Sequence, residues 1–170
     1  MDPVLPDDAD LALLRAIARG GWDDAEVRRV WIEAGWELIA EDADVLQFEA
    51  EFGSGRTVVT MHRRHDDMTP ALYVPLAFFW GASWADRDGY DQAFRRIATH
   101  LGGLLGKPTA AGEYPSPVAV GRLLSYCWWS LADAAVVLVQ NDEFDPPPDP
   151  DVSVWVFPPR DKIRLPVTDN

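Results

Sequence analysis

The first third of the chain repeats its apolar residues with a helical period. Leucines and an isoleucine at positions 11, 14 and 17 share one helical face, and glycines at 20 and 21 end the pattern. A capping signature follows, because Asp23 and Glu26 lie three residues apart and apolar residues then recur at i, i+3, i+4 and i+7. The pattern predicts two consecutive helices, the first beginning near residue 8 and the second ending before residue 35.

After residue 35 the apolar period changes to two, which is typical of strands. Residues 36–40 form a short strand candidate, and residues 45–52 alternate clearly between apolar and polar side chains. The sequence Gly-Ser-Gly at 53–55 predicts a hairpin into residues 57–64. A four-residue loop over 53–56 is favoured over a three-residue loop because it buries more carbon. It places these residues on the apolar side: Thr57, Val59 and Met61.

The second half of the chain contains one more helical pattern and several more strand patterns. Residues 72–80 are almost all apolar, but Pro75 cannot donate to a ladder, so this strand is expected at an edge or with a bulge. A third helix is expected from Asp86 or Asp88 to the Gly-Lys-Pro stop at 106–108. A loop rich in Gly and Pro then leads to about residue 120. Three strand candidates follow, at residues 123–131, 134–140 and 152–157.

This order, ααβββ(β)αβββ, predicts an α+β fold. We expect two antiparallel meanders merged into one twisted sheet of about six strands, with three helices mainly on one face. The chain has neither a repeat period nor a Gly/Ser-rich linker, so residues 1–170 are expected to form a single domain, with an ordered core over about 8–158 and frayed ends. Four tryptophans are expected in the core: Trp31, Trp36, Trp128 and Trp155.

Composition restricts the functional classes. The 170 residues include 28 acidic and 15 basic side chains, a net charge of −13, 48% hydrophobic residues and one cysteine. A disulfide-stapled mini-protein and a disordered chain are both excluded. The charge argues against nucleic acids and anionic membranes as partners, because both are themselves negative. Without a signal-like start or a spanning run, a cytoplasmic location is expected, and Cys127 is expected to be a small buried hydrophobe.

One candidate for metal chemistry lies at the end of a predicted strand. Residues 62–67 contain His62, His65 and Asp66, and two imidazoles with a carboxylate can bind a divalent transition metal. However, His62 and His65 are three residues apart, so they point to opposite faces of an extended chain unless a turn intervenes. A solvated, charged strand end is therefore the favoured interpretation, and neither a metal nor a cofactor is expected.

A candidate for nucleophilic catalysis follows the apolar strand. Residues 81–85 resemble the G-x-S-x-G elbow, with alanine in place of the last glycine. A hydrolase also needs a later histidine, and His100 alone qualifies, within the third predicted helix. The glycines near 102–106 stand at a helix end, whereas phosphate loops need them at a helix start. The alternative hypothesis is thus a small-molecule-binding or hydrolytic protein with a pocket near Trp80, Ser83, Trp84 and His62.

Acidic residues are concentrated in two stretches that lack basic residues. Seven acids lie between Arg29 and Arg56 and six between Arg122 and Arg160. Aromatic residues alternate with these acids, which is typical of a surface that steers a basic partner and anchors it with rings. Ordinary solubilising charge, with the loop phenylalanine pinned to the core, remains an alternative. The predicted partner-binding residues are Glu49, Glu51, Asp142, Glu143, Phe144 and Asp145.

Several segments carry a resemblance to known bacterial domains: residues 22–37, 94–108, 128–129 and 152–156. Over roughly residues 10–158 the chain resembles a group of small, acidic, uncharacterised α+β domains of actinobacterial type. It is more loosely similar to the immunity proteins that protect bacteria from polymorphic toxins. This resemblance implies binding by occlusion and transfers no catalytic residue.

The leading hypothesis is a non-enzymatic, cytoplasmic, immunity-like protein that docks an acidic, aromatic-studded face onto a basic protein. A structural domain of a larger assembly is a further alternative.

Overall fold

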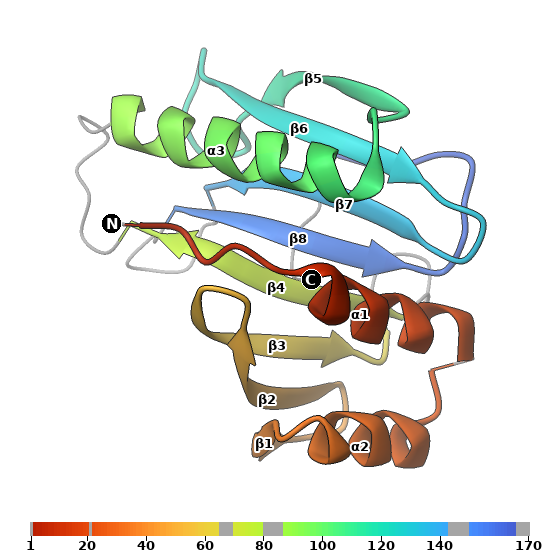
Figure 1. The fold of residues 1–170 in the computed structure, drawn as a ribbon. Helices are drawn as coiled ribbons and strands as arrows, with labels where there is room; N and C mark the ends of the chain where they lie inside the picture. The colour runs from red at the N-terminus through yellow and green to blue at the C-terminus, as the bar shows by residue number, and fades with distance from the viewer. Residues whose placement is uncertain (1, 21, 65–69, 80–86, 143–149, 166–170) are drawn as a thin grey trace.

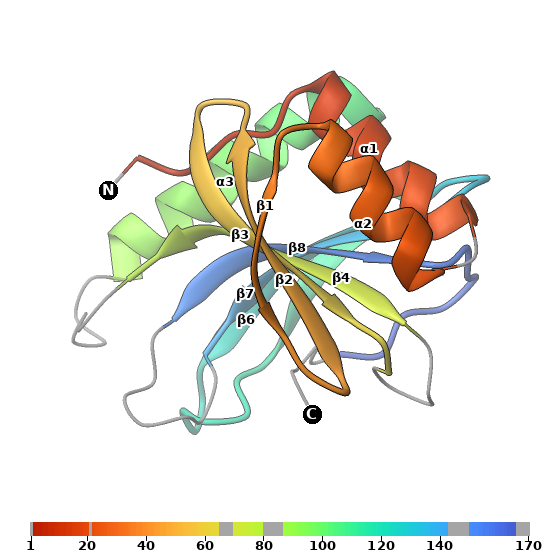
Figure 2. The same ribbon diagram turned by 90° about the horizontal axis from the view of Figure 1, so that it is seen from below.

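In the described part of the computed structural model, three helices cover one face of a single antiparallel sheet (Figure 1). The helices are α1 (Asp8–Gly20), α2 (Asp24–Glu33) and α3 (Arg87–Leu105). Figure 2 shows all three on the same side of the strongly twisted strands. The structure describes residues 2–20, 22–64, 70–79, 87–142 and 150–165. The α+β class and the placement of the helices are confirmed.

The sheet has eight strands in the described part of the chain, so the expectation of about six is wrong. Their order, β1-β2-β3-β4-β8-β7-β6-β5, makes two four-stranded meanders joined through the antiparallel β4–β8 pair. The first meander follows α1 and α2, and the second follows α3. The strands are β1 (Glu37–Glu41), β2 (Val45–Phe52), β3 (Gly55–His62), β4 (Ala71–Phe78), β5 (Ala110–Pro115), β6 (Leu123–Ser130), β7 (Ala135–Asn141) and β8 (Asp151–Phe157).

The sequence predicts a loop over the residues of β5. The predicted order of elements is therefore wrong here, because a strand lies between α3 and β6. Its six residues pair with β6, from Ala110 opposite Trp128 to Pro115 opposite Leu123. Only Tyr114 is buried, so the segment carries no apolar alternation. An edge strand tolerates Pro and Gly because one side of its ladder is unpaired. Tertiary pairing therefore decides this strand against its local composition.

The β2–β3 hairpin keeps the predicted faces with a shorter loop. Phe52 pairs with Gly55, so the connection is two residues long and the expected four-residue loop is wrong. A loop that is two residues shorter leaves each β3 side chain on its predicted face, because side chains alternate between the two faces with a period of two. Thr57, Val59 and Met61 are accordingly buried, as predicted.

Strand β4 lies inside the sheet, between β3 and β8. Its register with β8 shifts between Pro75 and Ala77, which agrees with the predicted bulge, whereas the predicted alternative of an edge position is wrong. Pro75 removes one backbone donor, and a bulge is one of the few ways to accommodate this loss within a sheet.

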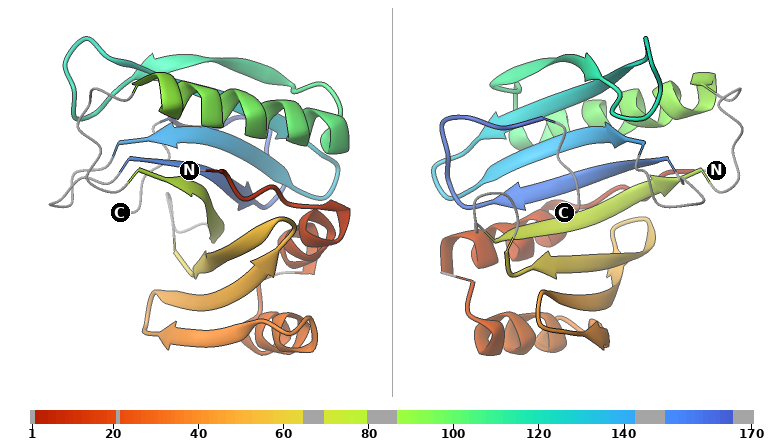
Figure 3. Two further views of the ribbon diagram at one scale, coloured as in Figure 1. Left: turned by 60° about the vertical axis from the view of Figure 1, so that its left-hand side comes forward. Right: turned by 180° about the vertical axis from the view of Figure 1, so that it is seen from behind.

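The main core lies between the helices and the sheet, where Trp31 packs edge to face on Phe48 and at a tilt on Trp36. Trp31 is fully buried, with its ring centroid 5.2 Å from that of Trp36 and 4.9 Å from that of Phe48. A smaller cluster, including Trp128 and Trp155, covers the helix-free face (Figure 3, right). All four predicted tryptophans are buried. So is Cys127, and burial raises the pKa of its thiol.

No helix among the described residues has the length and apolar character needed to span a membrane.

Candidate functional site

Acidic side chains from neighbouring strands meet on the helix-free face of the sheet. Glu37 of β1 lies directly opposite Glu49 of β2, and Glu51 of β2 lies opposite Arg56 of β3. Phe48 and Ala50 are buried in the main core, so the residues that alternate with them point to the other face. We call Glu37, Glu49, Glu51 and Arg56 the acidic strand face.

One guanidinium serves two carboxylates on the acidic strand face. Arg56 Nη1 lies 3.6 Å from Glu49 Oε2, and Arg56 Nε lies 3.8 Å from Glu51 Oε1. Both distances exceed those of hydrogen bonds, and the Arg56 and Glu51 side chains are 66% and 85% exposed. Glu37 has no ion pair with any residue that the structure describes. Two of the three carboxylates therefore share one loosely held cation and the third has none, so the face keeps an excess of negative charge.

The helix side of the same strands is better neutralised. Glu41 pairs with Arg28 and with Arg63, whose guanidinium also contacts Asp24 at 2.7 Å. Backbone N–H groups of the following residues donate to Asp42 and lower the pKa of its carboxyl. The acids of β1 and β2 thus divide into a neutralised group on the helix side and a poorly neutralised group on the helix-free side. The reason is that, among the described residues, Arg28 of α2 and Arg63 after β3 pair only with acids on the helix side.

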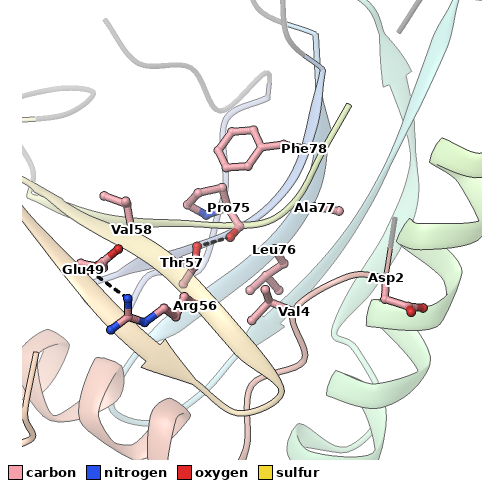
Figure 4. A pocket seen from close by; sticks show the side chains of 10 residues that line it. All are labelled: Asp2, Val4, Glu49, Arg56, Thr57, Val58, Pro75, Leu76, Ala77 and Phe78. Atoms are coloured by element: carbon pink, nitrogen blue, oxygen red, sulfur yellow. Dashed lines mark hydrogen bonds and ion pairs between the residues drawn. The ribbon is translucent and has the colours of Figure 1, made fainter. Parts of the chain in front are cut away.

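A pocket of about 270 Å³ adjoins the acidic strand face (Figure 4). It lies where β3 and β4 separate, since their ladder pairs only residues 60–62 with 71–73. Beyond the ladder, the Thr57 hydroxyl donates to the carbonyl of Pro75, and the Val4 N–H donates to the carbonyl of Leu76 at 2.7 Å. The pocket is lined by Asp2, Val4, Glu49, Arg56, Thr57, Val58, Pro75, Leu76, Ala77 and Phe78.

Asp142 lies inside the protein, with only 1% of its surface exposed. The Ser116 hydroxyl donates to one carboxylate oxygen, while Asp142 Oδ1 has no hydrogen-bond partner among the described residues. Burial raises the pKa of Asp142, against the opposing effects of the Ser116 hydrogen bond and the positive charge of Arg122. In this position Asp142 secures the loop before β6 and presents no carboxylate to a partner.

Asp142 belongs to a group of buried polar residues at one end of β7 and β8. The Tyr90 hydroxyl of α3 lies 2.8 and 2.9 Å from the carbonyl oxygens of Asn141 and Asp151, and burial raises the pKa of Tyr90. These bonds tie α3 to the two strand ends. The group was not foreseen, although polar residues that close an apolar strand were a signal: Gln140, Asn141, Asp142, Asp151 and Ser153.

Several predicted site residues lie outside the described residues: Glu143, Phe144, Asp145, His65, Asp66, Trp80, Ser83 and Trp84. The partner loop, the elbow and the pocket expected near the elbow therefore stay predictions.

His62 is described, and its ring stacks on Trp155 with centroids 5.6 Å apart. The described part of the chain holds no group of three or more potential metal ligands. His100 Nε2 lies 2.6 Å from the carbonyl oxygen of Pro6.

The structure brings together Glu49 and Glu51, as alternation predicted, and adds two residues that were not singled out. Glu37 had a signal in the count of acids, but its place opposite Glu49 depends on strand register. Arg56 had appeared only as the boundary of an acidic stretch.

Comparison with protein-family profiles, with curated proteins and with solved structures finds no match.

Proposed function

We propose that this chain is a cytoplasmic, non-enzymatic binding protein that docks the acidic strand face onto a basic protein. Its specific role, suggested by the resemblance to immunity proteins, is to neutralise a basic toxin by occlusion. The observation that carries the proposal is the direct opposition of Glu37 and Glu49, with Glu51 beside them and Arg56 as the shared cation.

Like charges opposite each other on neighbouring strands destabilise a sheet. A basic partner relieves this repulsion, because its Lys or Arg side chains supply the cations that the face lacks. The excess charge also steers a basic protein toward the face before contact and raises the association rate. Both effects favour binding through Glu37, Glu49 and Glu51.

The edge strand β1, which carries Glu37, also has an exposed apolar side chain. Ile39 of β1 is 49% exposed at the irregularity between Leu38 and Ala40. Exposed aliphatic groups beside charges are typical of contact surfaces, where apolar residues anchor and charged residues steer. Edge strands also present backbone groups that an extended partner segment can pair with.

The first prediction concerns the two acids of β2. In Glu49→Gln/Glu51→Gln, we expect binding of a fluorescein-labelled octalysine at low salt to weaken about tenfold, since each lost charge contact contributes about 0.5–1 kcal/mol. Fluorescence anisotropy measures the dissociation constant. Added salt should reduce the difference between wild type and variant, because salt screens exposed charges.

The matched control removes two charges elsewhere. Glu113→Gln/Asp161→Asn changes two exposed acids outside the acidic strand face and makes the net charge less negative by the same two units. We expect it to weaken binding less than twofold. Equal losses in both variants would show that octalysine responds only to net charge, and the proposed site would be refuted.

A further inference from the structure

The pocket beside the acidic strand face is a break in an otherwise continuous sheet. Strands β2 and β3 pair through all eight residues of each strand, whereas β3 and β4 pair through only three. Where the ladder stops, β4 is bonded in two other ways. The hydroxyl of Thr57 donates to the Pro75 carbonyl, and the N–H of Val4, in the N-terminal segment, donates to the Leu76 carbonyl. The opening therefore has its own set of hydrogen bonds.

Close backbone contacts hold the opening in place. The N–H of Ser54 donates to the carbonyl of Leu5, and the N–H of Leu5 donates to the Ser54 hydroxyl at 2.9 Å. Gly53 has φ +49°, and a Cβ there would lie 1.8 Å from the Leu5 oxygen. The N-terminal segment is thus fastened to the β2–β3 turn at a position that suits glycine.

The interior of the pocket is apolar and its rim is charged. Leu76 and Ala77 are 2% and 4% exposed, and Val4, Val58 and Phe78 are half-buried around them. Figure 4 shows Glu49 and Arg56 together on one side, while Asp2 lies apart, beside α3. Asp2 pairs there with Arg96 at 2.6 Å.

We infer that this pocket receives one apolar side chain of the basic partner, of about leucine size, flanked by a lysine or arginine that contacts Glu49. The inference rests on the proposed function. Charge complementarity selects the occupant, because a basic segment bound to Glu37, Glu49 and Glu51 passes the mouth of the pocket. Binding energy in protein interfaces concentrates where an anchor fills a pocket within a polar rim.

Two labelled heptapeptides test the inference with the intact chain: Lys-Lys-Lys-Leu-Lys-Lys-Lys and the same peptide with central glycine. We expect wild type to bind the leucine peptide about tenfold more tightly than the glycine peptide, because burial of a leucine side chain lowers the dissociation constant by about that factor. Methyl resonances of Val4, Val58 and Leu76 should shift with the leucine peptide only. Val58→Trp, which fills the pocket, should bind both peptides equally, and the smaller Val58→Ala should keep a preference for leucine.

Each outcome separates the inference from the proposed function. Equal binding of both peptides by wild type, with loss in Glu49→Gln/Glu51→Gln, refutes the pocket and leaves the acidic strand face. Methyl shifts that avoid the pocket also refute it. Binding of both peptides that ignores Glu49 and Glu51 refutes the proposed function itself. The methyl measurement uses wild type alone, so the test survives misfolding of the tryptophan variant.

Discussion

Gly53 illustrates how a single residue connects distant segments. Its positive φ is a conformation that side chains with a Cβ rarely adopt, and its missing Cβ leaves space for the carbonyl of Leu5. The sequence indicates a turn at this position, because Gly-Ser-Gly follows an alternating strand. The approach of Leu5 is a tertiary contact that no local pattern indicates.

The second prediction is therefore that Gly53→Ala destabilises the fold by about 2 kcal/mol, because a strained backbone costs about 1–3 kcal/mol. The Cβ would also displace Leu5, since the clash is with backbone atoms. Urea unfolding measures the change in the free energy of unfolding. Gly102→Ala in α3 is the control: a Cβ there meets nothing within 4 Å, so alanine should stabilise the helix by about 0.5–1 kcal/mol. Equal stability of the two variants would contradict the expected contact.

At the scale of elements, helix α2 shows what local chemistry can specify. Its N-cap Asp23 accepts a hydrogen bond from the Glu26 N–H at 3.1 Å, as the capping signature predicts. Strand β5 shows the opposite case, because its composition predicts a loop and only pairing with β6 makes it a strand. Helix ends carry their signals in adjacent residues, whereas edge strands depend on residues far along the chain.

The third prediction tests the cap of α2. Asp23→Ala should lower the free energy of unfolding by about 1 kcal/mol, because it leaves a helix-terminal N–H without its acceptor. Asp23→Asn should retain most of this stability, since an amide oxygen can accept the same bond. Thermal or urea unfolding distinguishes the two variants. An asparagine variant as unstable as the alanine variant would mean that charge, and not the hydrogen bond, is responsible.

At the scale of the whole molecule, two halves of similar element order share one core. Each half consists of one or two helices followed by a four-stranded meander, and the halves join through β4 and β8. The main core contains Trp31 and Phe48 from the first half and Trp129 and Val154 from the second. Because one apolar cluster spans both meanders, neither half keeps its core when the other unfolds.

The fourth prediction is a single cooperative unfolding transition. Tryptophans lie in both halves, so fluorescence follows both meanders, and far-ultraviolet circular dichroism follows the backbone. We expect the two urea curves to coincide, because coincident transitions by different probes are the sign of cooperative, all-or-none unfolding. A fluorescence transition in two steps would indicate that the halves unfold separately and would contradict the expected single domain.

The sequence by itself determined the α+β class, the three helices, the strands with regular alternation and the side of β2 on which Glu49 and Glu51 lie. These features follow from periodicity and caps, which act between residues close in the chain. Tertiary structure decided that Glu37 faces Glu49, that Arg56 stands between two carboxylates, and that Asp142 is buried. Strand register and burial bring together residues distant in sequence, so their charges and contacts depend on the whole sheet.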